Sequence, residues 1–380
     1  PSVAFLIDRW DPQRGGAERA LAQFAQHLLR RGHRVLAVAE QHALEAPGEH
    51  VTIASSGLTR SRRERDRARK LVAAARAHGA DVTIGCRHLY ECDLYWPHGG
   101  AHAVTFRQIR LSQGKSPDRA PYGRHKVFIE FERELLERGG ARSVACVSSM
   151  VVEEFARAWP ACRERLVLVE NGVELARFDP ALRTTVGAAL RREIGVDAQR
   201  ALLLFVARNP QLKGWKCVEA ALSLMIERGE RDWALLAVTP RRVGLATHRA
   251  RAGEAMVVWR ERLEPVASYL AADVALHPTW RDTSGLVVLE ALACGTPTVT
   301  SKFAGAASLV TGAAGEVLDD PADSAALADA IARQLARVRA GSVDRSAIRA
   351  RVAHLDSPLC HETLERIVLQ LVNEARRAKC

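Results

Sequence analysis

Short apolar runs alternate with amphipathic stretches along the whole chain. Five runs in the first half have the length and composition of buried strands, and they cover residues 3–7, 34–39, 82–84, 143–147 and 166–169. Five more follow, at residues 201–207, 233–238, 256–259, 274–277 and 298–300. Apolar positions at helical spacing occupy several of the intervals, namely residues 17–31, 126–138, 216–228, 286–294 and 325–338. This alternation is typical of parallel sheets, so it predicts an α/β protein with two doubly wound domains.

The strand pattern is interrupted between residues 171 and 192, where Asn-Gly and Asp-Pro pairs occur. We therefore expect a first domain over residues 1–172 and a second over 173–360, and 380 residues are enough for two cores. The last segment, residues 361–380, has helical periodicity and is expected to pack back on the first domain. Ligands of doubly wound sheets bind at the carboxyl ends of the strands, so a cleft between the domains is the expected site of chemistry.

Composition and charge narrow the class of protein. A hydrophobic content of 48% argues against a disordered chain, and no apolar run approaches the 18 residues of a membrane span. The net charge of +11 could indicate nucleic-acid binding, but basic patches interleaved with aromatic residues, a helix-turn-helix signature and a zinc finger are all missing. The eight cysteines are scattered without metal-ligand spacing, and the chain opens on a strand rather than a signal peptide. Buried free thiols in the reducing cytoplasm are the expectation.

The most informative segment follows the strand that ends at His277. A polar loop leads into a helix with good capping residues near Ser284. The amides of Gly285, Leu286 and Val287 would be free at the start of this helix and would face an anion such as phosphate. The field of a helix end is worth about 0.3–1 kcal/mol, so it orients a diphosphate but does not hold it alone.

Two carboxylates flank this expected anion site. Glu290 lies one turn beyond Leu286 on the same helix face, and Asp282 precedes the helix. Carboxylates suit hydroxyl groups better than phosphates, so the spacing favours a ligand with a central diphosphate and hydroxylated groups at both ends, as in a nucleotide-sugar. The same spacing is compatible with a simpler interpretation, in which Asp282 caps the loop and Glu290 is a solvated helix residue.

Cations that could balance a diphosphate follow the strand at residues 201–207. Arg208 ends this strand, and Lys213 with Gly214 opens the next helix. Arginine can bind phosphate in a bidentate fork, and lysine acts as a point charge. Such residues are often merely solvated, so their significance comes from their pairing with the 282–290 segment in the same domain.

The first half offers two weaker candidates. Gly15-Gly16 joins the first strand to a helix, but it lacks the G-x-G-x-x-G fingerprint, which disfavours a dinucleotide site. The pair either lets the backbone approach a ligand or forms a tight turn that requires a positive φ. His98 follows an apolar run and could donate to a substrate hydroxyl, although a lone loop histidine is usually without function.

Two basic runs stand out in the first domain. The run from Arg60 to Lys70 is the densest, and the stretch from Arg107 to Arg124 resembles a mobile basic loop. Most such runs are solvated faces. Alternatively, they attract an anionic acceptor or an anionic membrane surface, at about 1 kcal/mol per basic residue.

Three of these motifs, in this order and spacing, resemble the retaining GT-B glycosyltransferases of family 4. They are Gly15-Gly16-Ala17-Glu18-Arg19, then Arg208-x4-Lys213-Gly214, then Asp282-x7-Glu290 with Cys294-Gly295-Thr296-Pro297 after it. Within the family the chain is most similar to the lipopolysaccharide core glucosyltransferases, on Phe131-Glu132-Arg133-Glu134, Val169-Glu170-Asn171-Gly172-Val173 and Leu276-His277-Pro278.

The resemblance implies two Rossmann-like domains that face a central cleft, with an acceptor-binding domain first and a donor-binding domain second. It implies a retaining, metal-independent hexosyltransferase that uses a nucleotide-diphospho-sugar, with a UDP-sugar favoured. The acceptor would be a glycan or glycolipid, as in lipopolysaccharide core or other cell-envelope glycan synthesis. The enzyme would be cytoplasmic, with peripheral attachment to the inner face of the cytoplasmic membrane as a further hypothesis.

The resemblance also implies a role for each matching residue. Arg208 and Lys213 would bind the diphosphate, Glu290 the ribose, and Asp282 the donor sugar. The other donor contacts would come from Gly15, Gly16, Arg262, Ser284, Gly285, Leu286 and Val287, while His98 would lie near the sugar and the acceptor. The family usually has Glu where this chain has Asp282, which leaves the identity of the donor sugar open.

Other functions fit the same fold. A nucleotide-sugar epimerase or a sugar phosphorylase is one alternative, although an epimerase needs acid and base groups at the sugar ring, and only His98 and Asp282 are candidates. A non-catalytic relative that binds the donor is another. Formation of a transfer product would distinguish these functions.

Overall fold

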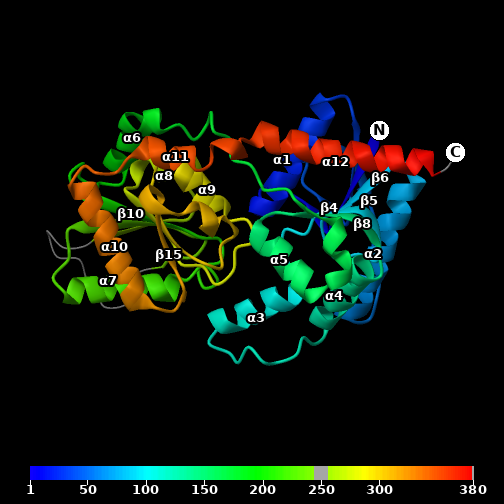
Figure 1. The fold of residues 1–380 in the computed structure, drawn as a ribbon, viewed down its shortest axis with the longest axis horizontal. Helices are drawn as coiled ribbons and strands as arrows, with labels where there is room; N and C mark the ends of the chain where they lie inside the picture. The colour runs from blue at the N-terminus through cyan, green and yellow to red at the C-terminus, as the bar shows by residue number, and fades with distance from the viewer. Residues whose placement is uncertain (244–255, 379–380) are drawn as a thin grey trace. The chain divides into compact units, whose positions relative to one another are not determined.

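The computed structural model describes residues 1–243 and 256–378 (Figure 1). The chain forms two compact units. Unit 1 consists of Pro1–Arg107, Ser116–Gly172 and the segment that starts at Pro358, and unit 2 consists of Gln108–Lys115 and Val173–Ser357. The C-terminal segment therefore belongs to the same unit as the N-terminus.

Unit 1 is built on a seven-stranded parallel sheet with the order β5-β3-β1-β6-β7-β8-β9. Its strands are β1 (Ser2–Leu6), β3 (Arg34–Ala39), β5 (Glu49–Thr52), β6 (Val82–Gly85), β7 (Cys92–Tyr95), β8 (Ala141–Cys146) and β9 (Leu166–Leu168). The strands β2 (Arg9–Trp10) and β4 (Gln41–His42) form a separate two-stranded sheet. Because the strands are parallel, their carboxyl ends share one edge, where ligands of such sheets bind.

Helices cover the unit 1 sheet through apolar faces. The helices are α1 (Gly16–Arg30), α2 (Arg60–Ala77), α4 (Arg124–Glu132), α5 (Ser149–Ala158) and α12 (Ser357–Arg377). In α1, Leu21, Phe24 and Leu28 are buried at helical spacing. In α12, which is drawn in red, Leu364 and Val368 belong to the same hydrophobic core as β1 (Figure 1).

Unit 2 contains a six-stranded parallel sheet with the order β12-β11-β10-β13-β14-β15. Its strands are β10 (Ala201–Val206), β11 (Trp233–Val238), β12 (Met256–Arg260), β13 (Val274–His277), β14 (Thr298–Ser301) and β15 (Gly315–Leu318). Its helices are α6 (Val186–Glu193), α7 (Trp215–Glu227), α8 (Pro265–Ala271), α9 (Leu286–Ala293), α10 (Ser324–Arg339) and α11 (Arg345–Ala350). The sheet order makes β10 and β13 neighbours, although about 70 residues separate them in the chain.

The structure contains several elements that were not predicted, among them the helices α5, α6, α8 and α11 and the two-residue strands β2 and β4. The strands β5, β7 and β15 were not predicted, because each has only four residues and includes polar ones. The expectation of a loop from Arg107 to Arg124 was wrong in part, since α3 (His102–Ser112) continues through Arg107 and Arg110 before the chain becomes irregular. Elsewhere the predicted strands and helices are confirmed, with ends that differ by a few residues.

Two findings concern the predictions made from composition, which were the absence of a membrane span and the state of the cysteines. Within residues 1–243 and 256–378, no helix is long and apolar enough to cross a membrane. The seven described cysteines are free thiols, and six of them are buried. Cys380 lies outside the described residues.

Candidate active site

Two loops at the carboxyl edge of the unit 2 sheet carry the residues expected to bind the donor. The loop after β10 holds Arg208 and Lys213, and the loop after β13 leads into α9. Because β10 and β13 are adjacent parallel strands, the two loops meet. The Trp280 amide donates to the Leu212 carbonyl at 2.9 Å, and the Lys213 Nζ donates to the Arg281 carbonyl at 3.0 Å.

Gly214 makes this contact possible. Its φ of +84° lies in the left-handed region, and a Cβ atom there would stand 1.9 Å from the Pro278 carbonyl oxygen. Any side chain at this position would push the two loops apart. The Lys-Gly pair seen in the sequence therefore has a physical basis, since the glycine brings the lysine to the second loop.

Asp282 is the centre of the cluster that results. Its Oδ2 lies 2.7 Å from the Lys213 Nζ and 2.9 Å from the His277 Nε2. Its Oδ1 accepts a hydrogen bond from the Gly285 amide at 2.9 Å. Burial alone would raise the pKa of this carboxyl, but the Lys213 charge and the His277 hydrogen bond hold the pKa well below its usual range. Asp282 is therefore ionised and forms an ion pair with Lys213.

The start of α9 differs in one respect from the expectation. Gly285 adopts a left-handed conformation, with a φ of +78°, directly before the first helical residue. Its amide is occupied by Asp282 rather than free for a ligand, which corrects the prediction for this residue. Helix geometry leaves the amides of Leu286 and Val287 without partners inside the helix, so these two remain the anion-binding candidates.

Glu290 is buried and held in place. It is 7% exposed, and its Oε2 accepts a hydrogen bond from the Tyr269 hydroxyl at 2.8 Å. Tyr269 is itself 1% exposed. The alternative that Glu290 is a solvated helix residue is therefore wrong, whereas Asp282 does cap its loop. Tyr269 was missed from the sequence because no local signal relates it to a residue 21 positions away.

The remaining donor-side candidates are more exposed. Arg208 follows β10 and Arg262 follows β12, both on the surface, while Ser284 is partly buried before α9. The parallel sheet places Arg208 and Arg262 at the same edge as the cluster. The structure thus joins Lys213, Asp282 and the start of α9 by direct contacts, with the two arginines at the surface of that edge.

In unit 1, Gly15-Gly16 lies next to a network of charges. Arg87 donates to the Asp8 Oδ1 at 2.9 Å and to the Glu18 Oε1 at 2.8 Å, and Arg14 Nη1 lies 3.3 Å from the other Asp8 oxygen. Burial would raise the pKa of Asp8, but Arg87 and Arg14 lower it overall. This network fixes the loop between β1 and α1.

The prediction of a turn with positive φ at Gly15-Gly16 was wrong. Gly15 is extended, with a φ of −179°, and Gly16 is the first residue of α1. The constraint at Gly15 is instead close packing, because a Cβ atom there would stand 2.9 Å from the Glu18 Oε2. The other interpretation, close approach of the backbone to a ligand, stays a prediction.

His98 lies directly after β7 and is a neutral side chain. Burial and the nearby Arg87 charge lower its pKa to about 4, and the neighbouring Trp96 backbone and Asn171 side chain oppose this shift only in part. Its ring lies 4.5 Å from that of Trp96. The structure adds Asn171 as a neighbour of His98.

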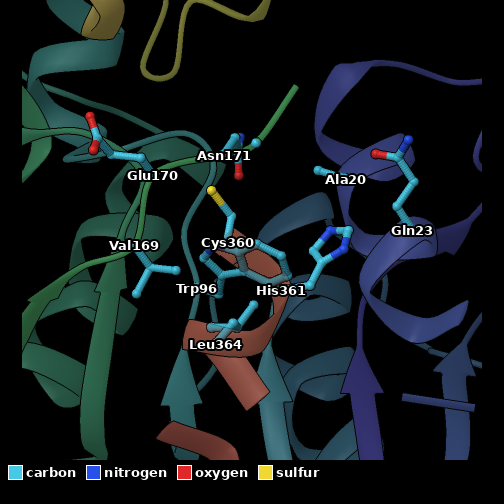
Figure 2. A pocket seen from close by; sticks show the side chains of 10 residues that line it. Ala20, Gln23, Trp96, Val169, Glu170, Asn171, Cys360, His361 and Leu364 are labelled. Carbon is cyan, nitrogen blue, oxygen red and sulfur yellow. The ribbon is translucent and has the colours of Figure 1, made fainter. Parts of the chain in front are cut away.

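Trp96 and Asn171 also line a small pocket in unit 1. The pocket collects side chains from α1, from residues 169–172 and from the start of α12, including Gln23, Cys360 and His361 (Figure 2). The Trp96 indole nitrogen is buried, and no hydrogen-bond partner for it occurs among the residues that the structure describes. It is a donor available to a polar ligand group or a water molecule.

The basic run in α2 is partly neutralised within unit 1. Arg67 contacts Glu40 at 2.7 Å and Glu64 at 2.6 Å, and Arg65 contacts Glu130 at 2.6 Å. Lys70 is paired with Asp66. The run is therefore less basic than its composition indicates. Outside residues 244–255 and 379–380, no group of His, Cys, Asp and Glu side chains could hold a metal ion, and metal independence stays a prediction.

Comparison with known proteins identifies the family. A model described as Glycosyltransferase Family 4 matches residues 14–177, and one described as Glycosyl transferases group 1 matches residues 200–337. The chain belongs to the family 4 glycosyltransferases. A D-inositol 3-phosphate glycosyltransferase of Thermobispora bispora is 31% identical over 69% of this chain, and the lipopolysaccharide glucosyltransferase WaaG of Escherichia coli is 23% identical over 84%.

The share of each relative that is matched differs. This glycosyltransferase spans 63% of the Thermobispora protein and 47% of a D-inositol 3-phosphate glycosyltransferase of Pseudarthrobacter chlorophenolicus, but 85% of WaaG. Solved structures share its fold. WaaG is similar with a TM-score of 0.79, 20% identity and coverage of 95% of this chain and 98% of that one. Anabaena HepE in complex with UDP-glucose is similar with a TM-score of 0.70, 18% identity and coverage of 97% and 99%. The expected GT-B fold is confirmed.

Proposed function

We propose that this glycosyltransferase moves a sugar from a nucleotide-diphospho-sugar, with a UDP-sugar favoured, to a glycan or glycolipid acceptor. Transfer retains the anomeric configuration and uses no metal ion. The observation that carries the proposal is the contact of Lys213 with the loop that leads into α9, through the Arg281 carbonyl and the Asp282 carboxylate. A cation and two helix amides at a sheet edge are suited to a diphosphate. The complex of HepE with UDP-glucose supports a UDP-sugar in this fold.

The proposed role of these groups is to stabilise the leaving diphosphate. Negative charge develops on the diphosphate as its bond to the sugar breaks, and the nearby positive charge of Lys213 and Arg208 lowers the energy of that state. The amides of Leu286 and Val287 act in the same direction. Removal of one preorganised donor of this kind typically costs about 10²–10³ in kcat.

The hydroxylated parts of the donor have separate partners. Glu290, held by Tyr269, is placed one turn into α9 to accept hydrogen bonds from the ribose. Asp282 remains the candidate for the donor sugar. Its carboxylate already binds Lys213, His277 and Gly285, so it would contact a sugar only with the lone pairs that these three partners leave.

Unit 1 is proposed to bind the acceptor. His98 is neutral at pH 7, because its pKa is lowered to about 4, so it can hydrogen-bond a hydroxyl without adding positive charge. The buried Trp96 N–H offers a second donor nearby. The role of Gly16 near the donor phosphate stays a prediction from the family resemblance. Lipopolysaccharide core or other envelope glycan synthesis is the proposed setting, in keeping with the likeness to WaaG.

The test of the donor site is the loss of transfer in Lys213→Ala and Arg208→Ala. Each is expected to lower kcat/KM at least about 100-fold while the melting temperature changes little. Lys302→Ala is the matched control, since Lys302 forms an exposed ion pair with Asp319 in the same unit. Product would be followed from a labelled UDP-sugar with an acceptor extract. Wild-type turnover in either site variant would refute the assignment.

The donor itself is tested by thermal shift with UDP-, GDP- and ADP-sugars. A ligand at 100 times its Kd stabilises by about 2.7 kcal/mol. Stabilisation by none of them would refute the donor proposal. Stabilisation without product from any acceptor would instead indicate a non-catalytic donor-binding relative.

Attachment to an anionic membrane through α2 is a further part of the proposal. The exposed Arg60, Arg62 and Arg63 at the start of α2 would make the contact. Sedimentation with vesicles that contain 30% or so anionic lipid, compared with neutral vesicles, tests it. Equal sedimentation with both would exclude an electrostatic contact.

A further inference from the structure

His277 is a buried residue next to the donor cluster that no assigned role explains. It is the last residue of β13, and its exposed fraction is 0%. Its carbonyl accepts hydrogen bonds from the Thr300 hydroxyl at 3.0 Å and from the Thr279 amide at 2.7 Å. The backbone at His277 is therefore fixed from the neighbouring strand β14 and from its own loop.

Among the residues that the structure describes, the imidazole makes one hydrogen bond, from Nε2 to the Asp282 Oδ2 at 2.9 Å. Its Nδ1 is buried, and no group among the described residues is hydrogen-bonded to it. Asp282 is ionised and can only accept, so Nε2 must carry the proton. An imidazolium would bear a second N–H on Nδ1 in a place without an acceptor, which costs about 1–3 kcal/mol for a buried donor. Burial also lowers the pKa of His277. The side chain is a neutral Nε2–H tautomer.

Asp282 in turn restrains Lys213 and the loop before α9, which are the groups expected to bind the diphosphate. One of its oxygens receives His277 and Lys213 together, and the other receives the Gly285 amide. The Asp282 side chain has two rotatable bonds, χ1 and χ2. Because its two oxygens together have three partners, both torsions are held in place. Lys213, with a flexible four-carbon stem, has its ammonium held by Asp282 and by the Arg281 carbonyl.

We infer that His277 is a positioning residue of the donor site: its neutral imidazole fixes Asp282, and Asp282 fixes both Lys213 and the loop that opens α9. This inference rests on the proposed function, because it assigns the positioned groups to the donor diphosphate. It gives Asp282 a role that does not depend on contact with the donor sugar.

The inference predicts that donor binding weakens when the hydrogen bond between His277 and Asp282 is lost and is preserved when that hydrogen bond is kept. His277→Leu removes the Nε2–H donor and should weaken UDP binding and raise the donor KM about tenfold, with a smaller change in kcat. His277→Gln keeps an N–H group near the position of Nε2 and should stay within about threefold of wild type. Thr300→Val is the control, because it removes a hydrogen bond to the same residue without touching Asp282.

The decisive measurement combines these variants with Asp282→Asn. UDP affinity by calorimetry, donor KM, kcat and melting temperature are recorded for each single and double variant. If His277 acts through Asp282, His277→Leu adds less than about threefold once Asp282 is replaced. The inference would be overturned if the effects of His277→Leu and Asp282→Asn on UDP affinity simply multiplied in the double variant. Equal losses of UDP affinity in His277→Leu and His277→Gln would also overturn it.

A second measurement uses the wild-type protein and does not depend on the folding of a variant. Ring ¹⁵N chemical shifts of labelled histidine, with His277 assigned by its absence in His277→Gln, report the tautomer directly. A neutral Nε2–H ring at pH 7 is expected, and an imidazolium or an Nδ1–H ring would overturn the inference. Failure of the wild type to bind any nucleotide or nucleotide-sugar would instead refute the proposed function, while the tautomer result would still test the His277–Asp282 contact.

Discussion

Glu365 is expected to be the residue that secures α12 on unit 1. It is 5% exposed and accepts hydrogen bonds from the Nε2 atoms of His27 and His33, each at 2.9 Å, and from Arg31 at 3.4 Å. These three donors come from the end of α1 and the residues after it. The perturbation is Glu365→Gln, which keeps the size of the side chain and removes its charge.

The structure sets the magnitude of the loss. Burial alone would raise the pKa of Glu365, but its hydrogen bonds with His33, His27 and Arg31 lower the pKa from 4.5 to about 2. A shift of this size corresponds to about 3 kcal/mol, and screening at the exposed Arg31 reduces it to about 2 kcal/mol. For a unit of this size, the melting temperature should fall by about 4–8 °C.

Differential scanning calorimetry at pH 7 is the assay, and Glu374→Gln is the matched control. Glu374 lies on the same helix and also pairs with an arginine, Arg142 at 2.9 Å, but its side chain is 48% exposed. An exposed pair contributes less than about 1 kcal/mol. Glu365→Gln should therefore destabilise the protein clearly more than the control. Equal melting temperatures for the two variants would refute the reasoning.

The same residue predicts a pH dependence. A carboxyl whose folded-state pKa is lowered stabilises the protein above its ordinary pKa and loses that contribution as pH falls toward the folded-state value. For Glu365 this window runs from 4.5 down to about 2. The difference in unfolding free energy between wild type and Glu365→Gln should shrink as pH falls below 4.5. A difference that stays constant from pH 7 to pH 3 would contradict the assignment.

Two further predictions concern unit 2. Gly214→Ala should abolish measurable donor binding, because its Cβ would stand 1.9 Å from the Pro278 oxygen. Gly229→Ala is the control for backbone strain alone, because Gly229 has a φ of +85° and a Cβ there would have no atom within 4 Å. The control should lose only about 1 kcal/mol of stability. Tyr269→Phe should raise the donor KM about fivefold to tenfold, because Glu290 loses its 2.8 Å hydrogen bond, and steady-state kinetics with an unchanged KM would show that Tyr269 does not orient the carboxylate.

The sequence predicted the elements well where periodicity is strong. The apolar run at residues 201–207 and the helical spacing at 286–294 correspond to β10 and α9, because burial of one face imposes a period that a single segment records. The strands β7 and β15 were missed because each is short and contains an acidic residue, Asp93 or Glu316, so no continuous apolar run marks it. The helix α3 was taken for a loop since its basic residues obscure its apolar face.

Among candidate site residues, local motifs indicated Lys213, Gly214, Asp282 and Glu290, since their types and spacing limit the chemistry they can support. His277 and Tyr269 were not indicated as functional. Both are buried and resemble ordinary core residues in the sequence, and each becomes significant only through the carboxylate that it contacts.

What the sequence determined by itself is the alternation of strands and helices, the two-domain organisation it predicts, and the family to which its motifs belong. These are properties of neighbouring residues, and burial and backbone geometry act on them locally. Only the tertiary structure decided that Lys213 pairs with Asp282, that Gly285 gives its amide to the same carboxylate, and that Gly15 is extended. Contacts across about 70 residues depend on β13 lying beside β10, and strand order is set by packing of the whole sheet rather than by any one segment.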